Sequence, residues 1–277
     1  MDPGHDERRS QTRTRFPVKK AYFLSDTHLG AAYFPDSKER ERCVVDFLES
    51  IRDKASEIYL LGDILDYWYE YRYVVPRGFV RFFGKIAELS DAGIKITWII
   101  GNHDIWIFDY IPSELGVKVV DGSYITQVMG TRMLMAHGDG VWQHSRKFKI
   151  LRSLFRNKFC QRLFASIHPR WTVAFANAWS RHSRLSSENV DNHKNLEIQR
   201  KIDYNLSRLA EYCELHHKTD PECRYYLFGH LHIIADVKIA NDADMIILGD
   251  WLKNFSYAVY DGHEMKIEKY RACQTHT

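Results

Sequence analysis

The sequence predicts an α/β fold in which two stacked sheets are flanked by helices. Three short apolar runs, at 21–24, 58–61 and 96–100, each end in a polar cluster. Runs of this length and composition are typical of strands that are buried on both faces. Helical patterns lie between them, and a second group of strands follows further along the chain.

The predicted helices run roughly over 37–54 and 79–92, and Gly93 closes the second. A strand, a helix and a further strand at this spacing indicate crossover connections and a parallel sheet. In such sheets the polar residues that follow the strands converge on one crevice, where ligands bind. We therefore expect the polar clusters after the three strands to lie together.

The second group of strands is predicted at 124–129, 132–136 and 224–228. Two more, at 244–248 and 255–260, are expected to close this second sheet, with turns at Asp242 and at Asp261-Gly262.

Length and composition favour a globular protein. The chain has 277 residues, of which 45% are hydrophobic and 27% charged, and these values exclude a disordered or collagenous chain. The formal net charge of +3 is too small to argue for nucleic-acid binding. The cysteines are odd in number and widely spaced, which fits a reducing compartment better than a disulfide framework; they are residues 43, 160, 213, 223 and 273.

The N-terminal residues 1–20 are polar and Arg-rich, with neither the apolar core of a signal peptide nor a run that could cross a bilayer. We expect an intracellular protein that does not span a membrane. Its predicted organisation is a polar, disordered arm at 1–17 and one domain at 18–277, with a helical insert at about 141–215.

The insert has an unusual composition. Residues 141–200 contain twelve Lys or Arg and three acids, a net charge of +9, so the remainder of the chain sums to −6. The same segment is rich in large apolar residues, and it is predicted to form helices with basic and apolar faces.

The strand ends supply seven oxygen or imidazole donors: Asp26, His28, Asp63, Asn102, His137, His230 and His232. This mixture suits two divalent ions such as Mn, Fe or Zn better than Ca. In a dinuclear centre, ions about 3.5 to 4 Å apart provide an activated water and a clamp for in-line phosphoryl displacement. A single histidine after a strand is usually structural, and Gly-Asp is a common turn, but the joint occurrence in this order is not explained by packing alone.

These motifs resemble the calcineurin-like metallophosphoesterases, whose pattern is D-x-H, G-D, G-N-H-[DE], H and G-H-x-H. Every element is present, from about Tyr22 to Tyr260. The resemblance implies a four-layer α/β-β-α sandwich that binds two metal ions.

The resemblance also implies roles for individual residues. One ion would be held by Asp26, His28, Asp63 and His232, and the other by Asp63, Asn102, His137 and His230. His103 would contact the phosphate and protonate the leaving oxygen, with Asp104 orienting it; an imidazole is suited to proton transfer near neutral pH. Asn102 and His230 are expected to contact the substrate as well.

Within this family the chain resembles the branch that cleaves the pyrophosphate of UDP-2,3-diacylglucosamine in lipid A biosynthesis. The resemblance rests on 62–68, 137–139, 156–159, 179–184 and 248–251. It implies UMP and 2,3-diacylglucosamine 1-phosphate as products and a helical lid that holds the acyl chains. The donor types accept Mn, Fe and Zn alike, and of these we expect two Mn²⁺ ions. It also implies a cytoplasmic enzyme attached peripherally to the inner membrane of a Gram-negative bacterium. Nucleic acid and an obligate protein partner are not expected.

The sequence departs from this branch at His103, where well-known members carry Arg. Lid residues Ser180 and Arg184 are expected to contact the polar part of the substrate. Trp68 and Tyr67 are assigned to core packing, and Asp66 to a helix cap rather than to a position behind the metal ligands.

Several alternatives remain open from the sequence. The insert suits a substrate with a diphosphate and two acyl chains, but it also fits a helical hairpin with a solvated basic face, or a groove for nucleic acid. The whole chain could instead be a phosphoesterase for soluble nucleotides or phosphoproteins, or a non-catalytic lipid- or protein-binding module on the same fold.

Overall fold

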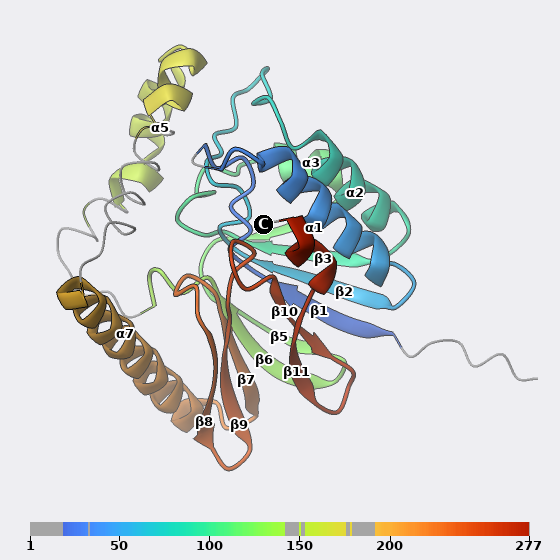
Figure 1. Cartoon of the computed structure of the whole chain (residues 1–277), viewed down its shortest axis with the longest axis vertical. Coiled ribbons are helices and arrows are strands. Elements are labelled where there is room, and N and C mark those ends of the chain that lie inside the picture. Colours follow the sequence, from blue (N-terminus) through green and yellow to red (C-terminus); the bar gives the residue numbers. More distant parts are fainter. Residues whose placement is uncertain are drawn as a thin grey trace, which may run out of the picture.

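The computed structural model describes residues 19–32, 34–141, 150, 153–175, 178 and 192–276. These residues form two mixed sheets with helices on both outer sides (Figure 1).

The first sheet has the strand order β11-β10-β1-β2-β3-β4. Strands β1 to β4 are parallel to one another, as the crossover spacing predicts. Strands β10 and β11 add an antiparallel edge beside β1. The strands are β1 (Lys20–Leu24), β2 (Ala55–Leu61), β3 (Lys95–Ile99), β4 (Lys118–Val120), β10 (Ser256–Tyr260) and β11 (Met265–Lys269).

The second sheet has the order β5-β6-β7-β9-β8. The central three strands β6, β7 and β9 are parallel to one another, and antiparallel strands flank them. The strands are β5 (Tyr124–Val128), β6 (Thr131–Ala136), β7 (Cys223–Phe228), β8 (Ile234–Ala240) and β9 (Ala243–Leu248).

The assignment of 255–260 to the second sheet was wrong, because β10 pairs antiparallel with β1 of the first sheet. Ala258 and Tyr260 face the second sheet, whereas Val259 packs under the helices of the first. A strand that is apolar on both faces fits either sheet, so its own pattern could not decide between them.

Alternate residues of the strands build three separate apolar layers, as the period of two in a strand requires. Leu60 and Trp98 face outward under α1 (Ser37–Ile51), α2 (Val80–Asp91) and α3 (Tyr110–Leu115). Their neighbours in the strands pack between the sheets. On the far side, α7 (Asn192–Thr219) covers the second sheet through residues such as Leu209 and Cys213 (Figure 1). The result is the expected four-layer sandwich.

The described part of the insert is helical at 153–156, at α5 (Lys158–Ala165), at 169–175 and in α7, most of which falls within it. It is attached to the loop after β2: the hydroxyl of Tyr69 donates to the carbonyl of Gln161 at 2.6 Å, and the hydroxyls of Tyr71 and Thr172 lie 2.6 Å apart. Among the helices that the structure describes, none has the length and apolarity needed to cross a bilayer.

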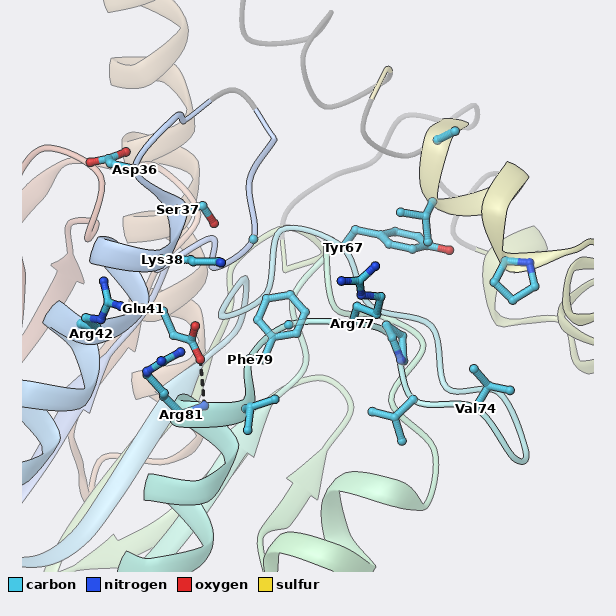
Figure 2. A pocket seen from close by; sticks show the side chains of 18 of the residues that line it. Asp36, Ser37, Lys38, Glu41, Arg42, Tyr67, Val74, Arg77, Phe79 and Arg81 are labelled. Atoms are coloured by element: carbon cyan, nitrogen blue, oxygen red, sulfur yellow. Dashed lines mark hydrogen bonds between the residues drawn. The ribbon is translucent and has the colours of Figure 1, made fainter.

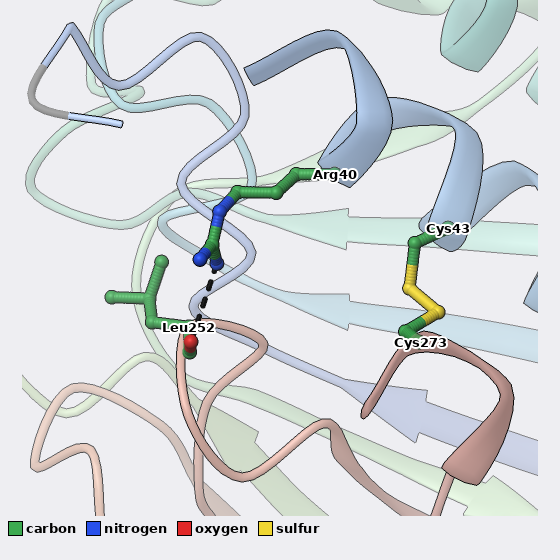
Figure 3. The surroundings of a disulfide bond; sticks show 4 residues. All are labelled: Arg40, Cys43, Leu252 and Cys273. Atoms are coloured by element: carbon green, nitrogen blue, oxygen red, sulfur yellow. Dashed lines mark hydrogen bonds between the residues drawn. A yellow bond between two sulfur atoms is a disulfide. The ribbon is translucent and has the colours of Figure 1, made fainter. Parts of the chain in front are cut away.

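A disulfide joins Cys43 of α1 to Cys273 in the C-terminal 3-10 helix η1 (Arg271–His276), with the two Cα atoms 5.8 Å apart (Figure 3). The expectation that the cysteines form no disulfide was wrong for this pair. Because 230 residues separate the two positions, only the antiparallel return of β10 and β11 brings the chain end back to α1. Spacing along the sequence gives no sign of this contact.

Candidate metal centre

The predicted donors come together because five parallel strands point their carboxyl ends at the same side of the sandwich. Each donor lies in the loop directly after its strand. Asp26 and His28 follow β1, Asp63 follows β2, Asn102 follows β3, His137 follows β6, and His230 and His232 follow β7.

One cluster consists of Asp26, His28 and His232, whose ligand atoms all lie within 4.8 Å of one another. The Asp26 carboxylate Oδ1 is 3.8 Å from His28 Nε2 and 3.5 Å from His232 Nε2. The first two side chains are buried. Three such atoms around one small space are the arrangement that a divalent ion requires.

A second cluster consists of Asp63, His137 and His230. His137 Nε2 lies 3.2 Å from Asp63 Oδ2 and 3.2 Å from the amide oxygen of Asn102. The same Asp63 Oδ2 is 3.8 Å from His28 Nε2 of the first cluster. Asp63 is thus in reach of both groups of ligands, which is the position of a bridging carboxylate.

The backbone of this site is strained. Five of the seven donors have positive φ values between 42° and 66°, namely Asp26, His28, Asp63, His230 and His232. Residues with a Cβ rarely adopt this conformation, and such strain concentrates at functional sites. Gly62 is needed for close approach as well, since a Cβ there would lie 2.6 Å from His137 Nδ1.

Partners behind the imidazoles fix their orientation. His137 Nδ1 donates to the Leu61 carbonyl at 2.8 Å. His28 Nδ1 lies 3.1 Å from Asp66 Oδ1, and His232 Nδ1 lies 3.3 Å from Asp250 Oδ2. In each ring the Nε2 atom is therefore the one presented to the cluster, as in metal sites where a carboxylate or carbonyl holds the far nitrogen.

Two expectations for nearby acids were wrong. Asp66 caps no helix, because no helix begins there; it lies behind His28 and its carbonyl accepts from His103 Nδ1 at 2.7 Å. Asp104 does not orient His103. Its buried carboxylate instead ties the loop after β3 to two neighbouring segments through bonds from Gly101 N (2.7 Å), Ile64 N (3.0 Å) and Trp98 Nε1 (3.1 Å).

Asp250 is a residue whose contact with the site the sequence reasoning did not predict. Its second carboxylate oxygen accepts from the backbone N–H groups of Lys253 and Asn254, both at 2.9 Å. The sequence pattern that could have indicated Asp250 is a Gly-Asp pair after the apolar strand β9, because the same pattern marks Asp63.

Trp68 is fully buried in the core, as expected. Ser180 and Arg184 lie outside the described residues.

The electrostatics of the cluster agree with a cation site. Burial opposes ionisation of Asp26, but His232 and His28 outweigh it and lower the Asp26 pKa to about 2. Burial also disfavours a charged His28, yet the neighbouring Asp26 and Asp66 carboxylates raise its pKa to about 9. Burial and the positive His137 together lower the His230 pKa to about 4.

The residues present fit divalent metal ions. Asp26 Oδ1 and His28 Nε2 are buried and have no hydrogen-bond partner within the described part of the chain. An unpaired buried carboxylate oxygen is costly unless a ligand satisfies it. The donor set of carboxylate, amide and imidazole, together with the fixed imidazole rings, is the chemistry of Mn, Fe and Zn sites.

Comparisons with known proteins agree with this geometry. The family model for calcineurin-like phosphoesterases matches residues 19–234. A UDP-2,3-diacylglucosamine hydrolase of Porphyromonas gingivalis is 41% identical over 90% of this chain and 97% of the relative. Proteins of the same name from Haemophilus influenzae and Neisseria meningitidis are each 25% identical, over 86% of this chain and 93% and 92% of their own length. The chain therefore belongs to the calcineurin-like phosphoesterase family.

Proposed function

We propose that this protein hydrolyses the pyrophosphate bond of UDP-2,3-diacylglucosamine, releasing UMP and 2,3-diacylglucosamine 1-phosphate. The observation that carries the proposal is the position of Asp63, within 3.8 Å of His28 and 3.2 Å of His137, between two clusters of metal-ligand type. The substrate is inferred from the activity for which relatives are named that align over 86% to 90% of this chain.

Asp63 would be a ligand of both of two Mn²⁺ ions. Asp26, His28 and His232 would complete the site of the first ion, and Asn102, His137 and His230 that of the second. The chemistry that two bound divalent ions supply is activation of a water and neutralisation of charge on the phosphate oxygens. The chain itself contributes fixed ligand positions, because the rings are held from behind.

His103 is the proposed general acid. Its Nδ1–H donates to the Asp66 carbonyl at 2.7 Å, which leaves Nε2 to hold the proton that the leaving phosphate oxygen takes up. The ring stands edge-on to His28, with centroids 4.7 Å apart, and its side chain is 29% exposed. His103 is thus beside the ligands and open to a substrate. Water adds to phosphorus, the bond to the bridging oxygen breaks, and that oxygen receives the proton.

The part of the insert that precedes α7 is proposed as a lid over the substrate, with Ser180 and Arg184 at its polar part. Several large apolar side chains of its described helices are more than half exposed: Phe159, Leu163, Trp171 and Phe175. Exposed Arg162 and Arg170 lie among them. Apolar and cationic side chains together suit the surface of an anionic membrane, so we place the protein at the cytoplasmic face of the inner membrane.

The test is incubation of the purified protein with Mn²⁺ and UDP-2,3-diacylglucosamine, followed by mass analysis of the products, beside an Asp63→Ala variant. Release of UMP by the unmutated protein alone supports the proposal. Equal release by both preparations assigns the activity to a contaminant. Cleavage of water-soluble phosphodiesters with none of the lipid substrate identifies a phosphoesterase of different specificity.

A further inference from the structure

The loop between β9 and β10, residues 249–255, contacts two ligands of the first cluster. The Trp251 backbone N–H donates to the Asp26 carbonyl at 3.1 Å. Asp250 Oδ2 lies 3.3 Å from His232 Nδ1. One short loop thus holds residues that follow β1 and β7, which belong to different sheets.

Asp250 folds this loop with one carboxylate oxygen and holds His232 with the other. Its Oδ1 accepts from the backbone N–H groups of Leu252, Lys253 and Asn254 at 3.2, 2.9 and 2.9 Å. The turn also brings the Asn254 side-chain amide to the His232 carbonyl, to which it donates at 3.3 Å. Because the Asp250 side chain is buried and both of its oxygens accept, the loop and the ring together require an ionised carboxylate.

An amide at position 250 would replace only one of these two oxygens. The oxygen of an asparagine accepts, whereas its NH2 group donates. If the oxygen keeps the turn, the NH2 group faces His232 Nδ1, and the ring proton then has to lie on Nε2. A protonated Nε2 does not bind a metal ion. Asp250→Asn therefore separates the folding of the loop from the positioning of the ligand.

The loop is supported from α1. Arg40 Nη1 donates to the Leu252 carbonyl at 3.2 Å (Figure 3), and the Arg40 side chain is only 13% exposed. The buried Trp251 ring packs on Phe47 of the same helix, with ring centroids 4.9 Å apart. A hydrogen bond from a charged donor is stronger than a neutral one, so α1 holds the loop in a fixed position.

The second cluster has its supports on other elements. His137 Nδ1 donates to the carbonyl of Leu61, at the end of β2, at 2.8 Å. Asp63 Oδ1 accepts from the His103 backbone N–H, in the loop after β3, at 2.9 Å. The two clusters share Asp63 but are held from different parts of the fold. A change in the loop between β9 and β10 should therefore affect one ion more than the other.

We propose that Asp250 is a positioning residue that sets the affinity of the first metal ion, the one assigned to Asp26, His28 and His232, with little effect on the second. It acts through the tautomer of His232 and through the loop that holds Asp26. This inference rests on the two-ion centre of the proposed function.

The test is Mn²⁺ titration of the metal-free full chain, with free Mn²⁺ measured by EPR, for the wild type and Asp250→Asn. We expect the dissociation constant of one ion to rise about 10- to 100-fold in the variant, the usual cost of losing a partner behind a metal ligand, and that of the other ion to stay constant. Asp261→Asn is the matched control, because Asp261 Oδ1 also accepts from two backbone N–H groups, at 3.0 and 3.1 Å, in the turn between β10 and β11. Thermal melting verifies that each variant is folded.

A second background assigns the affected ion. His232→Ala should weaken the binding of the same ion. Adding Asp250→Asn to this variant should cause no further loss, because the ring through which Asp250 acts is absent. A further tenfold loss in the double variant would show that Asp250 acts by another route, and would overturn the proposal.

The support from α1 provides an independent variant. Arg40→Met removes the bond to the Leu252 carbonyl and should raise the same dissociation constant about two- to tenfold, the usual range for one hydrogen bond. Arg42→Met is its matched control. Arg42 lies on the same helix but lines a separate cavity of about 1280 Å³ with Lys38 and Arg81, and the described lining of this cavity contains none of the predicted metal ligands (Figure 2). Unchanged affinity in Arg40→Met would overturn the role of the loop.

Equal affinity of the wild type and Asp250→Asn for both ions overturns the proposal, as does equal weakening of both ions. A wild-type chain that binds fewer than two Mn²⁺ ions refutes the two-ion centre and the proposal with it. Two bound ions without hydrolysis of the lipid substrate refute the proposed function alone, because metal binding is measured without substrate.

Discussion

The carboxylate of Asp66 lies 3.1 Å from His28 Nδ1. Since an ionised carboxylate only accepts, the ring donates from this nitrogen and presents Nε2 to Asp26 and Asp63. Asp66 thereby acts on the metal centre through another residue. Its own backbone carbonyl holds His103 in the same way, so one residue positions a proposed metal ligand and the proposed acid.

Replacing Asp66 tests this positioning role. We expect Asp66→Ala to weaken Mn²⁺ binding about 10- to 100-fold, the usual cost of removing a partner behind a metal ligand. Asp66→Asn keeps an acceptor for His28 and should recover most of the affinity. Metal titration of the metal-free protein measures both, with the exposed Asp53→Ala as the control. Unchanged affinity in Asp66→Ala would contradict the role.

Loss of His103 separates acid catalysis from metal binding. In His103→Ala we expect kcat to fall by about 10² to 10⁴, the range for a missing general acid, with two metal ions per chain retained. Metal content by mass spectrometry and steady-state kinetics are the measurements. His263→Ala, in the exposed hairpin between β10 and β11, is the matched control. Loss of a metal ion from this variant would show that His103 is itself a ligand. The geometry permits this, because the ligand atoms of His103, His28 and Asp63 all lie within 4.8 Å of one another.

Proton release should accompany metal binding. The raised His28 pKa of about 9 means that the metal-free ring carries a proton at neutral pH, and a ligand must be deprotonated. His137, another proposed ligand, also has a raised pKa, so the apparent Mn²⁺ affinity should increase by at least about tenfold per pH unit between pH 7 and 9. Calorimetry in buffers of different ionisation enthalpy measures the released proton. A flat affinity over this range would disprove the linkage.

The raised pKa of His28 also makes the stability of the metal-free protein depend on pH. Because the folded-state pKa of His28 lies above the unfolded value of about 6.5, its contribution to the free energy of unfolding is complete below pH 6.5. The contribution is lost as the pH rises through about 9. Urea denaturation of the metal-free protein at pH 6.5 and 9.5 should thus show lower stability at the higher pH, and His28→Gln should remove this part of the difference.

The disulfide between Cys43 and Cys273 should raise the free energy of unfolding. Without reductant, Cys43→Ser should lower the free energy of unfolding by about 2 to 4 kcal/mol, because the cross-link restricts the unfolded chain. Added dithiothreitol should abolish the difference from wild type. Cys160→Ser is the matched control, since Cys160 is free and partly exposed. A thiol assay that finds all five cysteines free in the unreduced protein would exclude the bond.

Local pattern predicted much of the fold and of the candidate site. Each of the strands β1, β2 and β3 is an apolar run followed by its donors, and a parallel sheet necessarily places such donors on one side. The positions of Asp26, Asp63 and Asn102 depend only on where a strand stops. For this reason the seven donors could be predicted together from the sequence.

Contacts between distant segments were decided by the tertiary structure alone. The place of β10 beside β1, the bond of Cys43 to Cys273 and the partnership of Asp250 with His232 join segments whose own patterns do not specify a partner. The partners of Asp104 were likewise decided by the fold, because a buried carboxylate accepts hydrogen bonds from whichever N–H groups the folded loops bring to it. The sequence by itself determined which residues follow each strand, because burial sets the local pattern. Only the tertiary structure decided which side chains hydrogen-bond to those residues, because these contacts depend on how sheets, helices and loops pack together.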